Sequence, residues 1–159
     1  MQRIHFEDLH EGDVLRGDAV LADQEETMAC DRLNDPWPTH VHEAFAARSP
    51  FGGVIASGGS TVTLTYRSPI GLFDTPERRW EFLGGLDWEV RFAKPVRPGG
   101  RLRARLTILE TRPSSRPGRG VVRDLTEMTD QDGDAALSVE VVFLLATRPD
   151  GDPPARPAA

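Results

Sequence analysis

The second half of the chain, from about Arg79 onward, is dominated by alternating apolar and polar residues. A period of two is typical of strands that bury one face. Segments rich in Pro, Gly, Ser and Asp interrupt the alternation at 113–118 and 130–134, as turns between strands do. The pattern predicts strands at 80–83, 86–94, 101–111, 119–130 and 135–147, with the long ones joined in antiparallel hairpins. We therefore expect one curved antiparallel sheet.

The first half carries helical signals. After a predicted strand at 14–21, residues 23–26 (Asp-Gln-Glu-Glu) have the form of a capping box, so a helix should begin there and run to about Leu33. Two prolines end this helix and stiffen the loop 35–40, and short helical turns are expected at 42–47. Helices followed by a run of strands indicate an α+β domain.

The segment 58–70 is ambiguous by itself. Its threonines and Val62 favour a strand by propensity. Its length and its start in small residues permit a buried helix instead. Local propensity alone would make it a strand.

Size and composition are those of one soluble domain. The 159 residues are 38% hydrophobic and 28% charged, which suits a single globular unit that we assign to 1–148. The Pro- and Ala-rich end, 149–159, is expected to be a disordered tail. No run approaches the roughly 20 apolar residues of a membrane span, and the N-terminus lacks the apolar region of a signal peptide. We therefore expect no membrane association and a cytoplasmic location.

The formal charge of −6 argues against a nucleic-acid partner, because such proteins usually carry a basic surface. Basic residues do cluster locally, at Arg91, Lys94, Arg97, Arg101, Arg103 and Arg105 and again at Arg112, Arg116, Arg119 and Arg123. These clusters form either a solvated outer face or contacts to the phosphates of an anionic cofactor. The lone Cys30 excludes an internal disulfide and a cysteine-rich metal site, and we predict no metal centre.

One pair of residues is chemically distinctive. Asp35 and His40 lie five positions apart on the proline-stiffened loop, so their side chains can converge on one water molecule or substrate atom. A carboxylate and an imidazole placed in this way can divide a proton transfer between them. Alone, the pair is a weak signal, because an aspartate before proline is a common turn residue and a histidine in a loop is usually structural or solvated.

The sequence around this pair resembles the MaoC-like family of acyl-thioester hydratases and dehydratases. Segment 35–40, Asp-Pro-Trp-Pro-Thr-His, is similar to the family's Asp-x-x-Pro-x-His signature. Segment 51–58, Phe-Gly-Gly-Val-Ile-Ala-Ser-Gly, is similar to the stretch that leads into the family's central helix, in the form typical of an Ala-Ser-Gly subgroup. The likeness continues in order from about residue 6 to 147. It implies a hotdog fold, with a long central helix wrapped by a curved antiparallel sheet, in a homodimer or a dimer of dimers.

The resemblance also implies a hydro-lyase that adds water to a 2-enoyl thioester or removes it from a 3-hydroxyacyl thioester. Asp35 would take a proton from water, and His40 would hold that water and protonate C2. The backbone N–H of Gly58, at the start of the central helix, would be the oxyanion donor; a glycine needed only for tight packing is the alternative. Coenzyme A or an acyl carrier protein would carry the acyl group, so coenzyme A enters as part of the substrate and no separate cofactor is expected.

The resemblance places four further residues beside the substrate: Trp37, Phe51, Gly53 and Ser57. Trp37 departs from the family's usual Asn or Gln, so it either fills the core or an interface, or shapes the acyl tunnel. Two other functions stay open. An acyl-CoA thioesterase of the same fold commonly uses an acid on the central helix, and 57–70 contains no Asp or Glu. A non-catalytic acyl-thioester-binding subunit would have no need of both Asp35 and His40.

Overall fold

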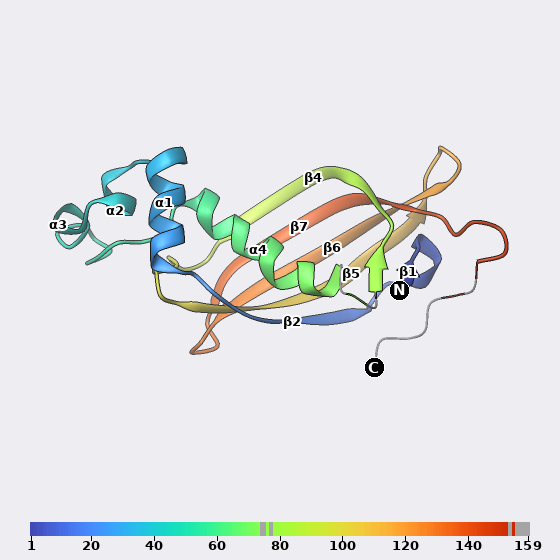
Figure 1. Ribbon diagram of the computed structural model, residues 1–159, viewed down its shortest axis with the longest axis horizontal. Coiled ribbons are helices and arrows are strands. Elements are labelled where there is room, and N and C mark those ends of the chain that lie inside the picture. The colour runs from blue at the N-terminus through green and yellow to red at the C-terminus, as the bar shows by residue number, and fades with distance from the viewer. Residues whose placement is uncertain (74–75, 77, 153, 155–159) are drawn as a thin grey trace.

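A curved antiparallel sheet wraps around one long helix (Figure 1). The computed structural model describes residues 1–73, 76, 78–152 and 154, with the backbone alone for 69–73. The main sheet has five strands in the order β2-β5-β6-β7-β4, and a second sheet pairs β1 with β3 in parallel. The strands are β1 Gln2–Ile4, β2 Val14–Leu21, β3 Arg78–Trp80, β4 Phe82–Phe92, β5 Arg101–Pro113, β6 Arg119–Asp130 and β7 Ala135–Ala146.

The α-helices gather on one side and at one end of this sheet, and are α1 Gln24–Asn34, α2 Pro38–Val41, α3 Glu43–Ala46 and α4 Gly58–Phe73. The 3-10 turn η1 Phe6–Asp8 lies next to β1 at the other end (Figure 1). Figure 1 shows α4 lying across the sheet between the edge strands β4 and β2, while α1, α2 and α3 project beyond one end. The arrangement is the α+β architecture expected from the order of the elements.

The segment with strand-like propensity is the central helix α4. Its buried residues recur every three or four positions, at Ser60, Thr61, Leu64, Thr65 and Ser68, and so form one helical face. The hydroxyls of Thr61 and Thr65 donate to backbone carbonyls of the preceding turn at 2.8 and 2.7 Å, which satisfies polar groups that α4 buries. Packing against the sheet therefore overrides propensity. Gly17 of β2 permits close contact, since a Cβ there would lie 2.4 Å from Ser68 Oγ.

Three local predictions need correction. The capping box is only half formed, because Asp23 accepts from the Glu26 N–H at 3.0 Å while the Glu26 carboxylate turns to Arg67 at 2.7 Å. The loop 35–40 is helical in its second part, since Pro38 starts α2 at a position where a proline needs no N–H. The strand expected at 80–83 is two strands, because β1 pairs with Arg78–Trp80 and β7 pairs with β4 from Phe82 onward.

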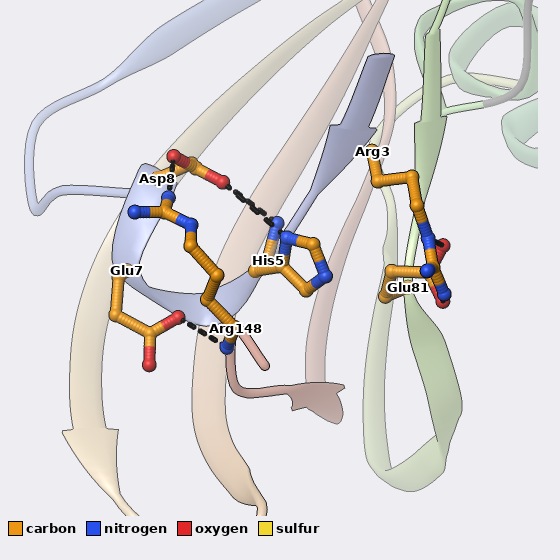
Figure 2. A network of polar contacts seen from close by, with 6 residues as sticks. All are labelled: Arg3, His5, Glu7, Asp8, Glu81 and Arg148. Atoms are coloured by element: carbon orange, nitrogen blue, oxygen red, sulfur yellow. Dashed lines mark hydrogen bonds and ion pairs between the residues drawn. The ribbon is translucent and has the colours of Figure 1, made fainter. Parts of the chain in front are cut away.

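Polar contacts hold β1 and the segment that follows β7 in place (Figure 2). Arg3 of β1 pairs with Glu81 at 2.7 Å. Arg148, just after β7, pairs with Asp8 through its guanidinium and donates its backbone N–H to Glu7 at 2.9 Å. Residues 153 and 155–159 of the expected tail lie outside the described residues.

Within the described part of the chain, no helix is long and apolar enough to cross a membrane. The same residues contain no group of three His, Cys, Asp or Glu side chains that could hold a metal ion.

Candidate active site

Asp35 and His40 come together where α1 gives way to α2. Asp35 is the C-terminal cap of α1, and its N–H donates to the Asp31 carbonyl at 2.9 Å, whereas His40 lies on α2. The Nε2 of His40 is 3.9 Å from Oδ2 of Asp35, with the histidine side chain 14% exposed and the aspartate side chain 51% exposed. That distance is too long for a direct hydrogen bond. Both atoms can instead contact one bridging water molecule or substrate atom.

A backbone carbonyl sets the orientation of the His40 ring. Its Nδ1 lies 2.9 Å from the carbonyl oxygen of Ile55. Because a carbonyl only accepts hydrogen bonds, Nδ1 carries a proton and donates it, which leaves Nε2 facing Asp35. The Ile55 N–H in turn donates to the Thr39 carbonyl at 3.2 Å. The segments 35–40 and 51–58, singled out separately in the sequence, are thus joined by two hydrogen bonds.

A buried aspartate that the sequence reasoning did not select, Asp31, organises the start of α4. It is 1% exposed. Its Oδ2 accepts the Ser57 N–H at 3.1 Å, and its Oδ1 accepts the hydroxyls of Ser57 at 2.6 Å and Ser60 at 2.5 Å. One sequence feature could have pointed to Asp31. It lies one turn before Asp35 near the C-terminus of α1, where the helix dipole disfavours negative charge, so two acids there need a reason.

Ser57, expected beside the substrate, is 2% exposed, and its polar groups are engaged within the protein. Besides its contacts to Asp31, its Oγ accepts the Ser60 N–H at 3.1 Å, as an N-terminal helix cap does. Its carbonyl accepts the Thr61 N–H at 2.9 Å. In this structure Ser57 orders the first turn of α4.

The N–H groups of Gly58 and Gly59 open α4. Such groups have no acceptor inside their own helix and lie at the positive end of its dipole. A Cβ at Gly58 would lie 3.2 Å from Cζ of Phe92 on β4, whereas at Gly59 the nearest atom would be 3.7 Å away. Close packing therefore also favours glycine at position 58. The geometry accommodates both interpretations of Gly58, donor and packing residue.

The remaining expected site residues lie on the surface around this centre. Trp37 caps the start of α2, a short helix that stands beyond the end of the sheet (Figure 1). It is 65% exposed and so does not fill the core of the protein. Phe51 is 39% exposed, and its carbonyl accepts from Arg97 at 2.5 Å. Gly53 follows in the same turn, where a Cβ would lie 3.1 Å from Arg97 Nη1.

Three of the six basic residues between Arg91 and Arg105 are used in ion pairs on the surface. Lys94 contacts Asp130 at 2.6 Å and Asp134 at 2.8 Å, and these hydrogen bonds raise the pKa of its ammonium above the usual range. Arg91 pairs with Glu89 and Arg105 with Glu127, at 2.5 and 3.0 Å. Arg97 differs, because it contacts the turn at Phe51 and Gly53.

Comparisons with known proteins identify the family of the chain. Residues 24–129 match the sequence family described as the MaoC like domain. Over 87 residues the chain is 39% identical to Nodulation protein N of Rhizobium leguminosarum bv. viciae, with 52% of each protein covered. The match thus spans about half the length of that curated relative.

Solved structures show the same fold. The MaoC-like dehydratase from Rhodospirillum rubrum matches with a TM-score of 0.80 at 28% identity, over 92% of this chain and 99% of that one. The R-hydratase PhaJ1 from Pseudomonas aeruginosa matches with a TM-score of 0.69 at 23% identity, over 98% of this chain and 97% of that one. The α+β hotdog fold expected from the sequence is confirmed.

Proposed function

Since the chain belongs to the MaoC-like domain family, we propose that it is a hydro-lyase that hydrates a 2-enoyl thioester or dehydrates a 3-hydroxyacyl thioester. One observation carries the proposal above all: Nε2 of His40 and Oδ2 of Asp35 face each other across 3.9 Å, next to the segment that leads into α4. Two groups that can exchange protons thus lie beside a helix start that can stabilise negative charge.

In the hydration direction, the oxygen of a water molecule held between Asp35 and His40 bonds to C3 of the enoyl group. Asp35 takes the proton that this water loses, and Nε2 of a protonated His40 delivers a proton to C2. The hydrogen bond from Nδ1 to the Ile55 carbonyl holds the ring in place throughout. Proton transfer from Asp35 back to His40, directly or through solvent, restores the starting state, and dehydration follows the reverse sequence.

Negative charge that develops on the thioester oxygen is assigned to the start of α4. The N–H of Gly58 is the proposed donor, supported by the helix dipole. Asp31, Ser57 and Ser60 hold this first turn in place through buried hydrogen bonds. Ser57 therefore supports the substrate site through the helix rather than through an exposed hydroxyl.

The acyl carrier is proposed to be coenzyme A, which enters as part of the substrate, with an acyl carrier protein as the alternative carrier. Trp37, Phe51 and Gly53, which belong to the segments 35–40 and 51–58 that carry the proposed site, are assigned to the thioester. Arg97 already contacts the turn that holds Phe51 and Gly53, so we assign it to a phosphate of the carrier, where a guanidinium can bind in a bidentate way.

A homodimer is proposed through β4, which is an edge strand of the main sheet. Among the described strands, β4 pairs only with β7. An exposed, apolar strand edge is a template for pairing with another chain. The strand exposes Phe82, Leu83, Leu86, Trp88 and Phe92. In contrast, the opposite edge β2 exposes only Val14 and Leu21 among its large apolar side chains. The expected result of replacing Leu86 with Glu is a monomer in light scattering.

The catalytic assignment is tested by separate variants, Asp35→Asn and His40→Ala. Loss of enoyl-thioester absorbance is followed with enoyl-CoA substrates of several chain lengths. We expect each variant to lower kcat/KM by about 10²–10⁴-fold, the usual contribution of a proton-transferring side chain. His10→Ala and Asp132→Asn, both on exposed turns, are the matched controls and should retain full activity.

The outcomes also separate the alternatives. Full activity in Asp35→Asn or His40→Ala would contradict the catalytic assignment. A wild-type protein that binds acyl-CoA but hydrates none of the substrates would be the non-catalytic binding subunit. Release of free coenzyme A from acyl-CoA would indicate a thioesterase, although α4 carries no Asp or Glu to activate water.

A further inference from the structure

A cavity of about 830 Å³ lies between the second half of α4 and the sheet. Aromatic side chains dominate its lining, namely Tyr66 of α4, Trp80, Phe82, Trp88 and Phe143. Neither Asp35, His40 nor Gly58 lines it. Arg3 and Glu81, which Figure 2 shows facing each other, lie on its wall and are partly exposed, so they mark the side open to solvent.

One acidic residue lines this cavity from the buried face of the sheet. Asp124 of β6 is only 3% exposed. Its cross-strand neighbours are Ile108 on β5 and Val141 on β7, and neither side chain can form a hydrogen bond. Among the described residues its Oδ1 has no hydrogen-bond partner. A polar group buried in this way costs free energy unless a partner is supplied.

The position of Asp124 also interrupts the hydrophobic core. One core cluster includes Val122 of β6, and a second includes Met128 of the same strand. Asp124 and Thr126 are the buried polar residues between them on that face. The cavity is therefore lined by aromatic side chains together with the polar side chains of Asp124 and Thr126. This combination suits a mostly apolar ligand with one polar group.

The charges around the cavity indicate what kind of polar group fits. Burial, and to a lesser degree the negative charge of Glu140, raises the pKa of Asp124 to about 7. With this pKa both forms of the carboxyl group are present near neutral pH, and the protonated form can both donate and accept a hydrogen bond. Arg3, Arg79 and Glu81 also line the cavity. Since Arg3 is paired with Glu81, the positive charge of Arg79 disfavours a cation. An uncharged hydroxyl is the group that matches both features.

We propose that this cavity binds the distal part of the acyl chain and that Asp124 selects acyl groups bearing a hydroxyl away from the thioester. The inference rests on the proposed function, because it takes the thioester to lie at Gly58. Thr65, which also lines the cavity, follows Gly58 by two turns, about 10 Å along the helix axis. A medium-length acyl chain directed along α4 spans that distance.

The test compares paired substrates that differ only at the chain end. These are 2-hexenoyl-, 2-octenoyl- and 2-decenoyl-CoA and the same three compounds with a terminal hydroxyl. We expect the wild-type protein to prefer the hydroxylated member of at least one pair by about 10- to 100-fold in kcat/KM, as one buried hydrogen bond can provide. Asp124→Leu should abolish or reverse that preference, Asp124→Asn should retain part of it, and Asp132→Asn should behave as the wild type.

Calorimetry with octanoyl-CoA and 8-hydroxyoctanoyl-CoA separates this inference from the proposed function, since saturated chains bind without reaction. If no substrate is hydrated but 8-hydroxyoctanoyl-CoA binds more tightly in an Asp124-dependent way, the hydro-lyase proposal fails and this one stands. If turnover occurs without a preference for any hydroxylated chain, or if Asp124→Leu leaves the preference unchanged, this inference is overturned. Tighter binding of 8-aminooctanoyl-CoA would overturn it in favour of a cationic group.

Discussion

Two buried aspartates, Asp31 and Asp124, occupy opposite environments in this protein. They are 1% and 3% exposed. Asp31 accepts three hydrogen bonds from Ser57 and Ser60 at the start of α4, whereas Oδ1 of Asp124 accepts none among the described residues and the side chain lines a cavity. The first carboxylate is committed to holding the protein together, and the second is available to a ligand. Burial alone does not distinguish these roles; the hydrogen-bond partners do.

The largest expected change in stability comes from replacing Asp31, the aspartate whose oxygens both accept hydrogen bonds. Asp31→Leu removes the acceptor of three hydrogen bonds, so the Ser57 N–H and the hydroxyl protons of Ser57 and Ser60 lose the carboxylate to which they donate. Since each such group costs about 1–3 kcal/mol, we expect a loss of roughly 3–5 kcal/mol in the free energy of unfolding measured with urea. Asp31→Asn, which keeps one acceptor oxygen, should lose less. Equal stability of Asp31→Leu and the wild type would mean that this network does not hold α4.

Replacing Asp124, whose Oδ1 has no hydrogen-bond partner among the described residues, should instead raise the free energy of unfolding at pH 8. One pKa unit corresponds to about 1.4 kcal/mol, so a rise from 3.8 to about 7 makes ionised Asp124 unfavourable in the fold by roughly 4 kcal/mol. Asp124→Asn removes the charge but still buries an amide, so we expect a gain of about 2 kcal/mol at pH 8 in the same unfolding measurement. A loss of stability at pH 8 would show that the carboxylate has a partner.

The pH dependence of that gain follows from the sign of the pKa shift. The folded protein keeps the Asp124 proton between about pH 4 and 7, where the unfolded chain releases it. Stability of the wild type relative to Asp124→Asn therefore falls as the pH rises through this window and is constant above it. Because the wild type loses roughly 4 kcal/mol across this window, it should be the more stable of the two proteins at pH 4, by about 2 kcal/mol. A difference that does not vary between pH 4 and 8 would contradict the raised pKa.

A smaller loss of stability is expected when only one of the hydrogen bonds to Asp31 is removed. Ser60→Ala removes one of its three hydrogen bonds but keeps the Ser60 N–H on the Ser57 hydroxyl. We expect a loss of about 1 kcal/mol, the usual net value of one hydrogen bond, with little effect on enoyl-CoA hydration. A loss as large as that of Asp31→Leu would show that the bonds to Ser57 contribute little by themselves.

Local signals predicted the sheet well. Alternation along 101–111, 119–130 and 135–147 is a property of neighbouring residues, so the strands β5, β6 and β7 could be read directly from it. The split of 80–83 into two strands was missed, because it depends on β1, which lies far away in the sequence. The helix α4 was ambiguous for a related reason: its threonines favour a strand until the sheet buries them on one helical face.

What the sequence by itself determined is the family, the run of strands and the candidate pair Asp35 and His40, because these depend on residue order and short spacings. Only the tertiary structure decided which other aspartates matter. Asp31 meets its partner Ser57 across 26 positions. Asp124 lies between two strands and lines a cavity with Thr65 and Tyr66 of α4, and none of the described residues supplies a partner for its Oδ1. Hydrogen-bond satisfaction is set by groups that folding brings together from distant segments, so no local pattern could distinguish the aspartate that supports α4 from the one that lines a cavity.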